Sequence, residues 1–182
     1  MKKIKKVIVG IGVSGSGKST YLKKYAHDNG YTYICVDDIR EELTGDAMDQ
    51  SVNSKAWEIA YERVGAAMEK GESIVFDSTM VSGQNRKDFC NLIKASKYFE
   101  SDSGQYLIKA VVFNTPLEVA LQRNSSRDRQ VPTDVIERQH QMLYTMRPLG
   151  SDGFDTLQTI ESFESENMKN TPRSESSANK IR

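Results

Sequence analysis

Short apolar runs alternate with longer amphipathic segments along most of this chain. The first run, Lys6–Ile11, is rich in β-branched residues and apolar on both faces, as expected for a buried parallel strand. Comparable runs cover Tyr31–Val36, Ser73–Phe76 and Tyr106–Phe113, and a further short strand is predicted near Thr156–Ile160. Because strands alternate with helical segments, we predict an α/β fold with a parallel sheet and helices on both faces.

Helical periodicity is clearest between the second and third strands. In Ser54–Lys70, four apolar side chains recur at intervals of three or four residues and so share one face of a helix. The other predicted helices are Lys18–His27, Ile39–Leu43, Asn85–Tyr98, Pro116–Arg123 and a last helix that starts at Pro132 and ends before Pro148. From Glu164 the chain is almost devoid of apolar residues. We therefore predict one domain over residues 1–163 and a disordered polar tail over residues 164–182.

Composition narrows the classes of function. The 182 residues include 25 basic and 25 acidic side chains, so the formal net charge is zero and any contact with nucleic acid must come from a local basic cluster. Cys35 and Cys90 lack the spacing of a disulfide framework or a zinc site. The apolar runs are shorter than the roughly 20 residues that a membrane span needs, and the N-terminal run is too short for a signal peptide. We expect a cytoplasmic protein without a membrane partner.

The most specific motif directly follows the first strand and reads Gly-x-x-x-x-Gly-Lys-Ser from Gly12 to Ser19. Its glycines allow the positive φ angles that turn backbone N–H groups toward a phosphate, and the helix that follows points its N-terminal dipole at the same place. In this motif Lys18 reaches the β- and γ-phosphates and Ser19 binds Mg²⁺. Thr20 comes one position too late to bind the metal, so we interpret it as a helix residue at the end of the nucleotide-binding stretch. The predicted site for ATP and Mg²⁺ consists of Gly12, Val13, Ser14, Gly15, Ser16, Gly17, Lys18, Ser19 and Thr20.

A carboxylate follows the second strand at the edge of the sheet where open α/β proteins bind ligands. Transfer of a phosphoryl group to a hydroxyl needs a base that accepts the proton, and we assign that role to Asp37. Arg40 lies one helical turn later and could bind an anionic group of the acceptor through two hydrogen bonds. The alternative for Asp37 and for Asp38 is that the side chain caps the short helix, and for Asp38 we favour the cap.

Two further candidates for the acceptor site lie near the third strand. Asp77 ends that strand, where it could hold Mg²⁺ through water or contact the acceptor, although it could also cap a loop. Arg86 is a weaker candidate, and a solvated helix surface fits its position equally well.

A polar stretch with three arginines separates the last two predicted helices. Small phosphotransferases need a cationic segment that closes over the triphosphate, and an arginine in that role is worth about 10³–10⁵ in rate. We therefore interpret residues 123–130 as an arginine-containing lid in which Arg123 and Arg127 bind the nucleotide. A solvated basic turn is the alternative, and it applies more strongly to Arg123 and Arg129 than to Arg127.

Together these motifs resemble the kinase domain of bacteriophage polynucleotide 5′-hydroxyl kinases, within the group of small P-loop kinases. The resemblance spans about residues 4–150 and rests on Gly12–Ser19, Val36–Arg40, Phe76–Thr79, Arg123–Arg127 and Val131–Ile136. It implies a P-loop kinase-type sheet, ATP as donor and a nucleic-acid 5′ end as acceptor. The phage enzyme also carries a phosphatase domain, for which we expect no counterpart within these 182 residues.

The resemblance also implies a role for each matching residue. Asp37 would be the general base, and Arg40 would hold the phosphate next to the acceptor nucleoside. Lys18, Ser19 and Arg127 would serve the donor, and Asp77 would lie near the acceptor.

Three functions are compatible with the sequence. The first is an ATP-dependent polynucleotide 5′-hydroxyl kinase that acts on RNA or DNA, and the second is a kinase of a small metabolite, sugar or nucleotide. The third is a non-catalytic nucleotide-binding module, against which Asp37 counts because a pure switch needs no acceptor base. A positive strip beyond Arg40, made by Lys55, Arg63, Arg86 and Lys87 on one face, would favour the first over the second.

Overall fold

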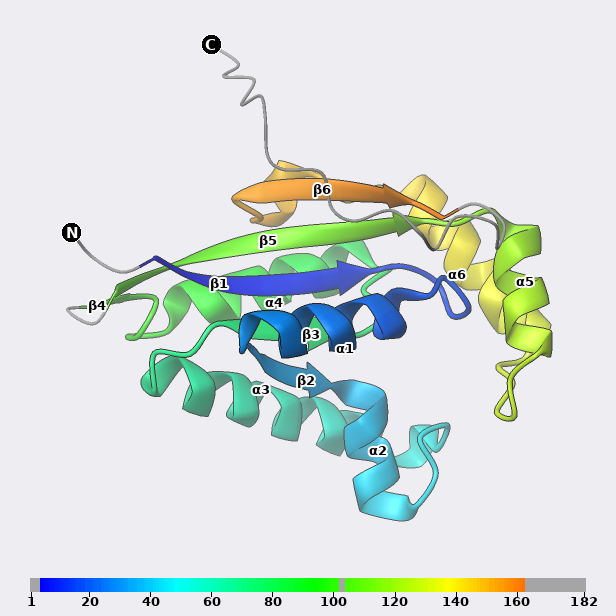
Figure 1. Cartoon of the computed structure of the whole chain (residues 1–182), viewed down its shortest axis with the longest axis horizontal. Helices are drawn as coiled ribbons and strands as arrows, with labels where there is room; N and C mark the ends of the chain where they lie inside the picture. The colour runs from blue at the N-terminus through cyan, green and yellow to red at the C-terminus, as the bar shows by residue number, and fades with distance from the viewer. Residues whose placement is uncertain (1–3, 102–103, 163–182) are drawn as a thin grey trace, which may run out of the picture.

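The fold is a parallel sheet between layers of helices, seen in a computed structural model that describes residues 4–101 and 104–162 (Figure 1). The strands β1 (Ile4–Ile11), β2 (Thr32–Cys35), β3 (Ile74–Asp77), β5 (Gly104–Asn114) and β6 (Thr156–Glu161) are parallel in the order β2-β3-β1-β5-β6. A two-residue strand, β4 (Glu100–Ser101), pairs antiparallel with the start of β5. The predicted α/β class, and the short strand near residue 156, are thus confirmed.

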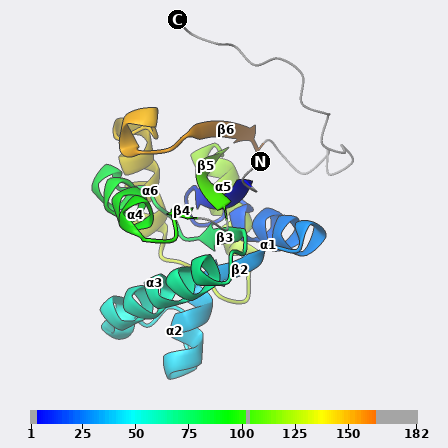
Figure 2. The same cartoon turned by 90° about the vertical axis from the view of Figure 1, so that its left-hand side faces the viewer.

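Helices cover both faces of the sheet, as predicted (Figure 2). Helix α1 (Lys18–Asn29) lies on one face, and α2 (Val36–Thr44), α3 (Asn53–Glu69) and α4 (Gly83–Ala95) lie on the other. The remaining helices are α5 (Leu117–Ser125), α6 (Thr133–Thr145) and the short 3₁₀ helices Gln50–Val52 and Gly150–Asp152. Within the described ranges, no helix combines the length and the apolar character that crossing a bilayer requires.

Burial of both sheet faces explains why the strands read as continuous apolar runs. In β1, Val7, Val9 and Ile11 pack into the core beneath α3 and α4, whereas Ile8 packs toward α1. Because β1, β2 and β3 are parallel neighbours, their carboxyl ends meet at one edge. The loop after β1, the start of α2 and the end of β3 therefore converge there.

The second βα junction differs from its sequence-based prediction. Helix α2 begins at Val36, directly after β2, so Asp37 lies in the first helical turn and does not end the strand. A carboxylate is stabilised there by the partial positive charge of the helix N-terminus. The predicted tail over residues 164–182 lies outside the described residues.

Candidate active site

The loop between β1 and α1 has the backbone geometry expected of a phosphate loop. Gly15 and Gly17 have φ angles of +85° and +83°, and helix α1 begins at Lys18 as predicted. Gly15 is also fixed by packing, because a Cβ there would lie 2.2 Å from the carbonyl oxygen of Ala120 on α5. Gly12 lines no part of the pocket, and its N–H donates to the carbonyl of Thr79 at 3.0 Å. The first glycine thus ties the loop to the segment after β3.

A buried ion pair joins this loop to the end of β3. The ammonium of Lys18 contacts Asp77, and both side chains are nearly inaccessible to solvent. Tyr33 on β2 donates a hydrogen bond of 2.5 Å to the other oxygen of Asp77, and Ser19 also contacts this carboxylate. Asp77 is therefore integrated with the donor residues Lys18 and Ser19, which favours the metal-holding alternative over the acceptor contact.

The charges of this pair hold both groups ionised. Burial by itself would raise the pKa of Asp77, but the charge of Lys18 and the hydrogen bonds from Lys18, Tyr33 and Ser19 outweigh it and lower that pKa. Burial would likewise lower the pKa of Lys18, but Asp77 raises it. Burial and the charge of Asp77 raise the pKa of Tyr33, so its hydroxyl stays a donor.

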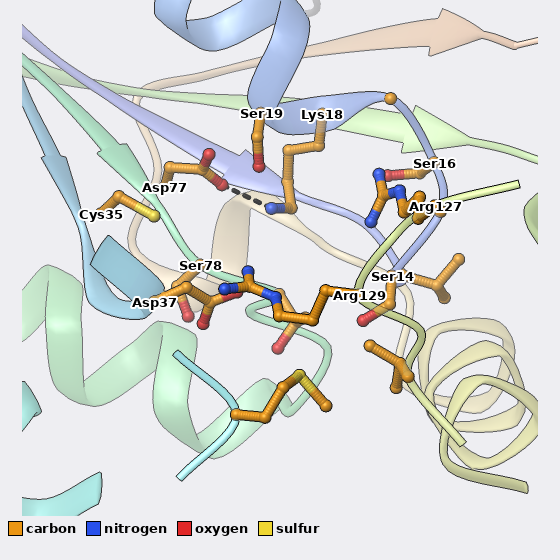
Figure 3. Close-up of a pocket in the computed structure, with 16 residues that line it drawn as sticks. Ser14, Ser16, Lys18, Ser19, Cys35, Asp37, Asp77, Ser78, Arg127 and Arg129 are labelled. Carbon is orange, nitrogen blue, oxygen red and sulfur yellow. Dashed lines mark hydrogen bonds and ion pairs between the residues drawn. The ribbon is translucent and has the colours of Figure 1, made fainter. Parts of the chain in front are cut away.

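A pocket lies over this pair, and its lining suits a nucleotide. Figure 3 shows Lys18, Ser19 and Asp77 on one side of the pocket and Asp37, Arg127 and Arg129 around it. The pocket is lined by residues 13–19, by residues 77–79 and by Cys35, Asp37, Met48, Arg127, Arg129 and Val131. Thr20 is exposed on α1 and does not line it, because the next helix position turns away from the pocket.

Two observations test whether these residues fit ATP and Mg²⁺. The Ser16 hydroxyl is buried within the loop and has no hydrogen-bond partner among the described residues, as expected of a polar group whose partner is a bound ligand. Ser19 and Asp77 contact each other, and both offer oxygen atoms that can serve as ligands to Mg²⁺. Mg²⁺ usually keeps waters and phosphate oxygens as its other ligands.

Contacts from α5 and α6 hold the loop from outside. Gln139 on α6 accepts a 2.8 Å hydrogen bond from the backbone N–H of Ser14. Arg123, predicted to bind the nucleotide, donates to the carbonyl of Ser16 at 3.3 Å and to the hydroxyl of Ser162 at 2.7 Å. Arg123 does not line the pocket, because α5 carries it behind the loop. Its observed contacts support the loop, and its predicted contact with the nucleotide stays a prediction.

Asp37 and Arg40 lie next to each other at the start of α2. Asp37 lines the pocket, and just over half of its side chain is exposed. Arg40 forms an ion pair with Asp37 and donates to Asn53, at 2.9 and 3.3 Å, and to the carbonyl of Ala47 at 3.3 Å. Arg40 itself lines no part of the pocket. Its observed contacts orient Asp37 and attach α2 to the segment before α3.

The two later arginines of the lid face the pocket. Arg127 and Arg129 are both exposed and line it. In Figure 3, Arg127 lies beside the phosphate loop, whereas Arg129 extends toward Asp37 and Ser78. Arg129 also lies 3.9 Å from Glu41 on α2. No described residue accepts a hydrogen bond from the Arg127 guanidinium, so this cation is available to an anionic ligand.

Arg86 requires a correction. It is among the largest fully buried side chains, and its nitrogens donate to Asp152 and to the carbonyls of Met80, Val81 and Met146 at 2.6–3.0 Å. It does not line the pocket. Both sequence-based alternatives were therefore wrong for Arg86, because a buried carboxylate on a segment 66 residues away fixes it in the core.

The positive strip beyond Arg40 is not formed by the four proposed residues. Arg63 pairs with Glu42 and Lys55 with Glu58, so both charges are locally compensated. Arg86 is buried, and Lys87 lies exposed on α4. These four residues therefore give no support to an extended groove for a polynucleotide.

Several residues at the site had no strong signal in the sequence. Tyr33 and Gln139 contact the donor residues from elements that read as ordinary strand and helix. Met48 reaches the pocket from the predicted connection after α2, and Cys35 lines it from the end of β2. Burial raises the pKa of the Cys35 thiol to about 11, so the thiol is neutral near pH 7 and is no nucleophile.

Comparison with known proteins places this chain among relatives. Residues 7–148 match the model of the AAA_33 family, described as an AAA domain. A protein of Acanthamoeba polyphaga mimivirus, whose assigned name is bifunctional polynucleotide phosphatase/kinase, is 27% identical over 175 residues. That match covers 93% of this chain but only 36% of the mimivirus protein.

Solved structures share the fold at low sequence identity. A chain of the Pnkp1/Rnl/Hen1 RNA repair complex superposes with a TM-score of 0.69 at 20% identity, covering 81% of this chain and 46% of that one. A fungal RNA kinase gives 0.64 at 18% identity, with coverage of 93% and 79%. A gluconokinase of Sinorhizobium meliloti 1021 gives 0.55 at 18% identity, with coverage of 88% and 84%. These similarities show a P-loop kinase fold.

Proposed function

We propose that this chain, which belongs to the AAA_33 family of AAA domains, is an ATP-dependent kinase of polynucleotide 5′-hydroxyl ends. One observation carries the proposal. A carboxylate, Asp37, lines the same pocket as the phosphate-loop residues Lys18 and Ser19 and the lid residue Arg127. A module that only binds nucleotides needs no such group, whereas transfer to a hydroxyl needs a base beside the γ-phosphate.

The proposed reaction assigns a task to each of these residues. The acceptor hydroxyl oxygen attacks the γ-phosphorus of ATP, the bond from that phosphorus to the β–γ bridging oxygen breaks, and ADP leaves. The hydroxyl proton passes to a carboxylate oxygen of Asp37. Lys18 exchanges its contact with Asp77 for the phosphate oxygens, and Arg127 stabilises the charge on the transferred group. Ser19 and Asp77 would hold Mg²⁺, which neutralises phosphate charge when it is bound.

The nucleic-acid acceptor is supported by the names of relatives. The mimivirus protein is named for a polynucleotide phosphatase and kinase, and two structural neighbours are an RNA repair complex and an RNA kinase. This chain spans about a third of the mimivirus protein, so that protein's second activity has no counterpart in the proposal. We place the reaction in the cytoplasm, where ATP is available.

A kinase of a small metabolite is the second candidate. The missing positive strip favours it, because Lys55 and Arg63 are compensated by neighbouring acids and Arg86 is buried. The gluconokinase matches a comparable share of both chains. This alternative uses the same base and donor residues, so only the acceptor separates the two.

The deciding experiment supplies ATP labelled on the γ-phosphate, Mg²⁺ and matched oligonucleotides. We expect label on RNA or DNA with a 5′-hydroxyl and none on the same oligonucleotide with a 5′-phosphate. Gluconate and other polyols serve as the competing acceptors. Transfer to a polyol but to no nucleic-acid end would refute the polynucleotide assignment and leave the kinase assignment standing.

A further inference from the structure

A second hollow adjoins the nucleotide pocket, on the side of α1 and α2. The two share Ser19, Cys35, Asp37, Arg127 and Arg129, and the second hollow is completed by Lys23, Asp38, Ser126 and Asp128. We propose that this hollow is the acceptor subsite and that Lys23 binds the first phosphodiester after the reacting 5′-hydroxyl. This inference rests on the proposed function and names residues for its acceptor half.

The position of Lys23 on α1 follows from helix geometry. Ser19 and Lys23 are four residues apart, so they share one face of the helix, about 6 Å apart along its axis. Ser19 reaches the phosphate end of the pocket, and Lys23 lies one turn farther along the same lining. A hydroxyl placed at Asp37 therefore has a cation in the same hollow.

The surroundings of Lys23 hold its ammonium at the hollow. Its Nζ lies 3.3 Å from a carboxylate oxygen of Asp38 and 5.5 Å from the ring centroid of Tyr33. More than half of the Lys23 side chain is exposed, so a ligand can reach it. Asp38, which the sequence suggested as a helix cap, instead restrains this cation in the absence of an acceptor.

Arg40 is less suited to this task in the observed arrangement. Its guanidinium donates to Asp37, Asn53 and the carbonyl of Ala47, and it lines neither hollow. Lys23 lines the hollow directly, and its ion pair is with Asp38. The acceptor phosphate therefore meets Lys23, while Arg40 positions the base.

The lining also indicates what the subsite recognises. The described residues that line the second hollow are charged or small, and none of them is aromatic. Base recognition in single strands relies on stacking with aromatic side chains, so this hollow reads sugar and phosphate. We expect transfer rates that depend little on the identity of the 5′ base.

The test compares dinucleotide acceptors that differ only in the charge of their linkage. One carries a 5′-hydroxyl and a normal phosphodiester, and the other carries a neutral methylphosphonate in its place. Lys23→Gln should raise KM for the charged dinucleotide about three- to tenfold, as for a partly exposed charged contact, and leave KM for ATP unchanged. The same substitution should leave KM for the neutral dinucleotide unchanged.

Neighbouring residues provide matched controls. Lys24 is exposed and pairs with Asp28, away from the hollow, so Lys24→Gln should change neither KM. Asp38→Asn removes the neighbour that competes for Lys23 and should lower KM for the charged dinucleotide about twofold.

The outcomes separate this inference from the proposed function. The unmodified protein could transfer phosphate to the charged dinucleotide while Lys23→Gln shows the same KM for it. That result would overturn the role of Lys23 but not the proposed function. An equal rise in KM for both dinucleotides would overturn it as well, because the loss would then be independent of the phosphate charge. A complete lack of transfer to any nucleic-acid end would overturn the proposed function, and this inference with it.

Discussion

The donor half and the acceptor half of this site are built in different ways. In the donor half, Lys18 and Asp77 are buried, and β2, β3 and the phosphate loop hold them through mutual hydrogen bonds. In the acceptor half, Asp37 and Lys23 are largely exposed and lie on two helices. The donor half is thus preorganised before a ligand binds, whereas the acceptor half is an open surface whose charges are partly compensated by neighbouring acids.

This contrast has an energetic consequence. Exposed ion pairs contribute about 0–1 kcal/mol to stability, whereas loss of one partner from a buried pair costs about 3–5 kcal/mol. Substitutions in the acceptor half should therefore change turnover without destabilising the fold. Substitutions of buried charged residues should affect stability first.

The largest effect is expected at the lid. Arg127→Ala should lower kcat for transfer about 10³-fold or more, because it removes the cation that stabilises the transferred phosphoryl group. The melting temperature should stay the same, since Arg127 is exposed. Steady-state kinetics and thermal unfolding measure the two effects. Arg138→Ala, an exposed arginine on α6 that pairs with Asp134, is the control. A kcat close to that of the unmodified protein would remove Arg127 from the mechanism.

The base comes next. Asp37→Asn should lower kcat about 10²–10⁴-fold, because the amide cannot accept the hydroxyl proton. The affinity for ATP, measured by calorimetry, should be nearly unchanged, since the donor half does not depend on Asp37. Substantial turnover in this variant would contradict the role of Asp37 as base, and a large loss of ATP affinity would contradict the division into two halves.

Arg86 extends the comparison to a buried pair outside the pocket. Arg86→Met should lower the free energy of unfolding by about 3–5 kcal/mol, because Asp152 would be left buried without its cation. Arg63→Met removes an exposed partner of Glu42 and should cost less than about 1 kcal/mol. Urea denaturation of both variants measures the two losses in the free energy of unfolding. Similar losses would show that burial of the ion pair does not determine its contribution to stability.

A smaller effect than that of Arg86→Met is expected at Tyr33, within the donor half. Tyr33→Phe removes one hydrogen bond to Asp77 and should cost about 1–3 kcal/mol of stability at pH 7. Because the pKa of Asp77 is lowered in the folded protein, its stabilising contribution is complete above the ordinary aspartate pKa near 3.8 and declines as pH falls through the lowered value.

The same substitution should shift that acid dependence. Without the tyrosine donor the pKa of Asp77 rises toward its ordinary value, so the acid-dependent loss of stability in Tyr33→Phe should be smaller and should be complete at a higher pH than in the unmodified protein. Unfolding curves of both proteins, recorded between about pH 2 and pH 7, measure how stability depends on pH around the ordinary aspartate pKa. Coincident acid profiles would show that the hydroxyl does not hold the charge of Asp77.

Several features were predictable from the sequence because they depend on residues close together in the chain. The phosphate loop lies within Gly12–Ser19, and its positive φ angles and the start of α1 are properties of that segment. The strands of the sheet are buried on both faces and so read as apolar runs. The end of β2 was predicted one residue too late, because the helical periodicity that begins at Val36 is too short to recognise before Asp37.

Tertiary structure decided what the charged residues do. Arg86, Arg123 and Arg127 carry the same guanidinium, yet one is buried with Asp152, one supports the loop through Ser16, and one faces the pocket. The pairing of Lys23 with Asp38 likewise joins two helices, α1 and α2, that the tertiary fold brings together at this point. The sequence by itself determined the fold and the donor loop, because local backbone preferences and apolar periodicity specify both. The acceptor half depended on packing, because the partners of a charged side chain come from elements that are distant in the chain.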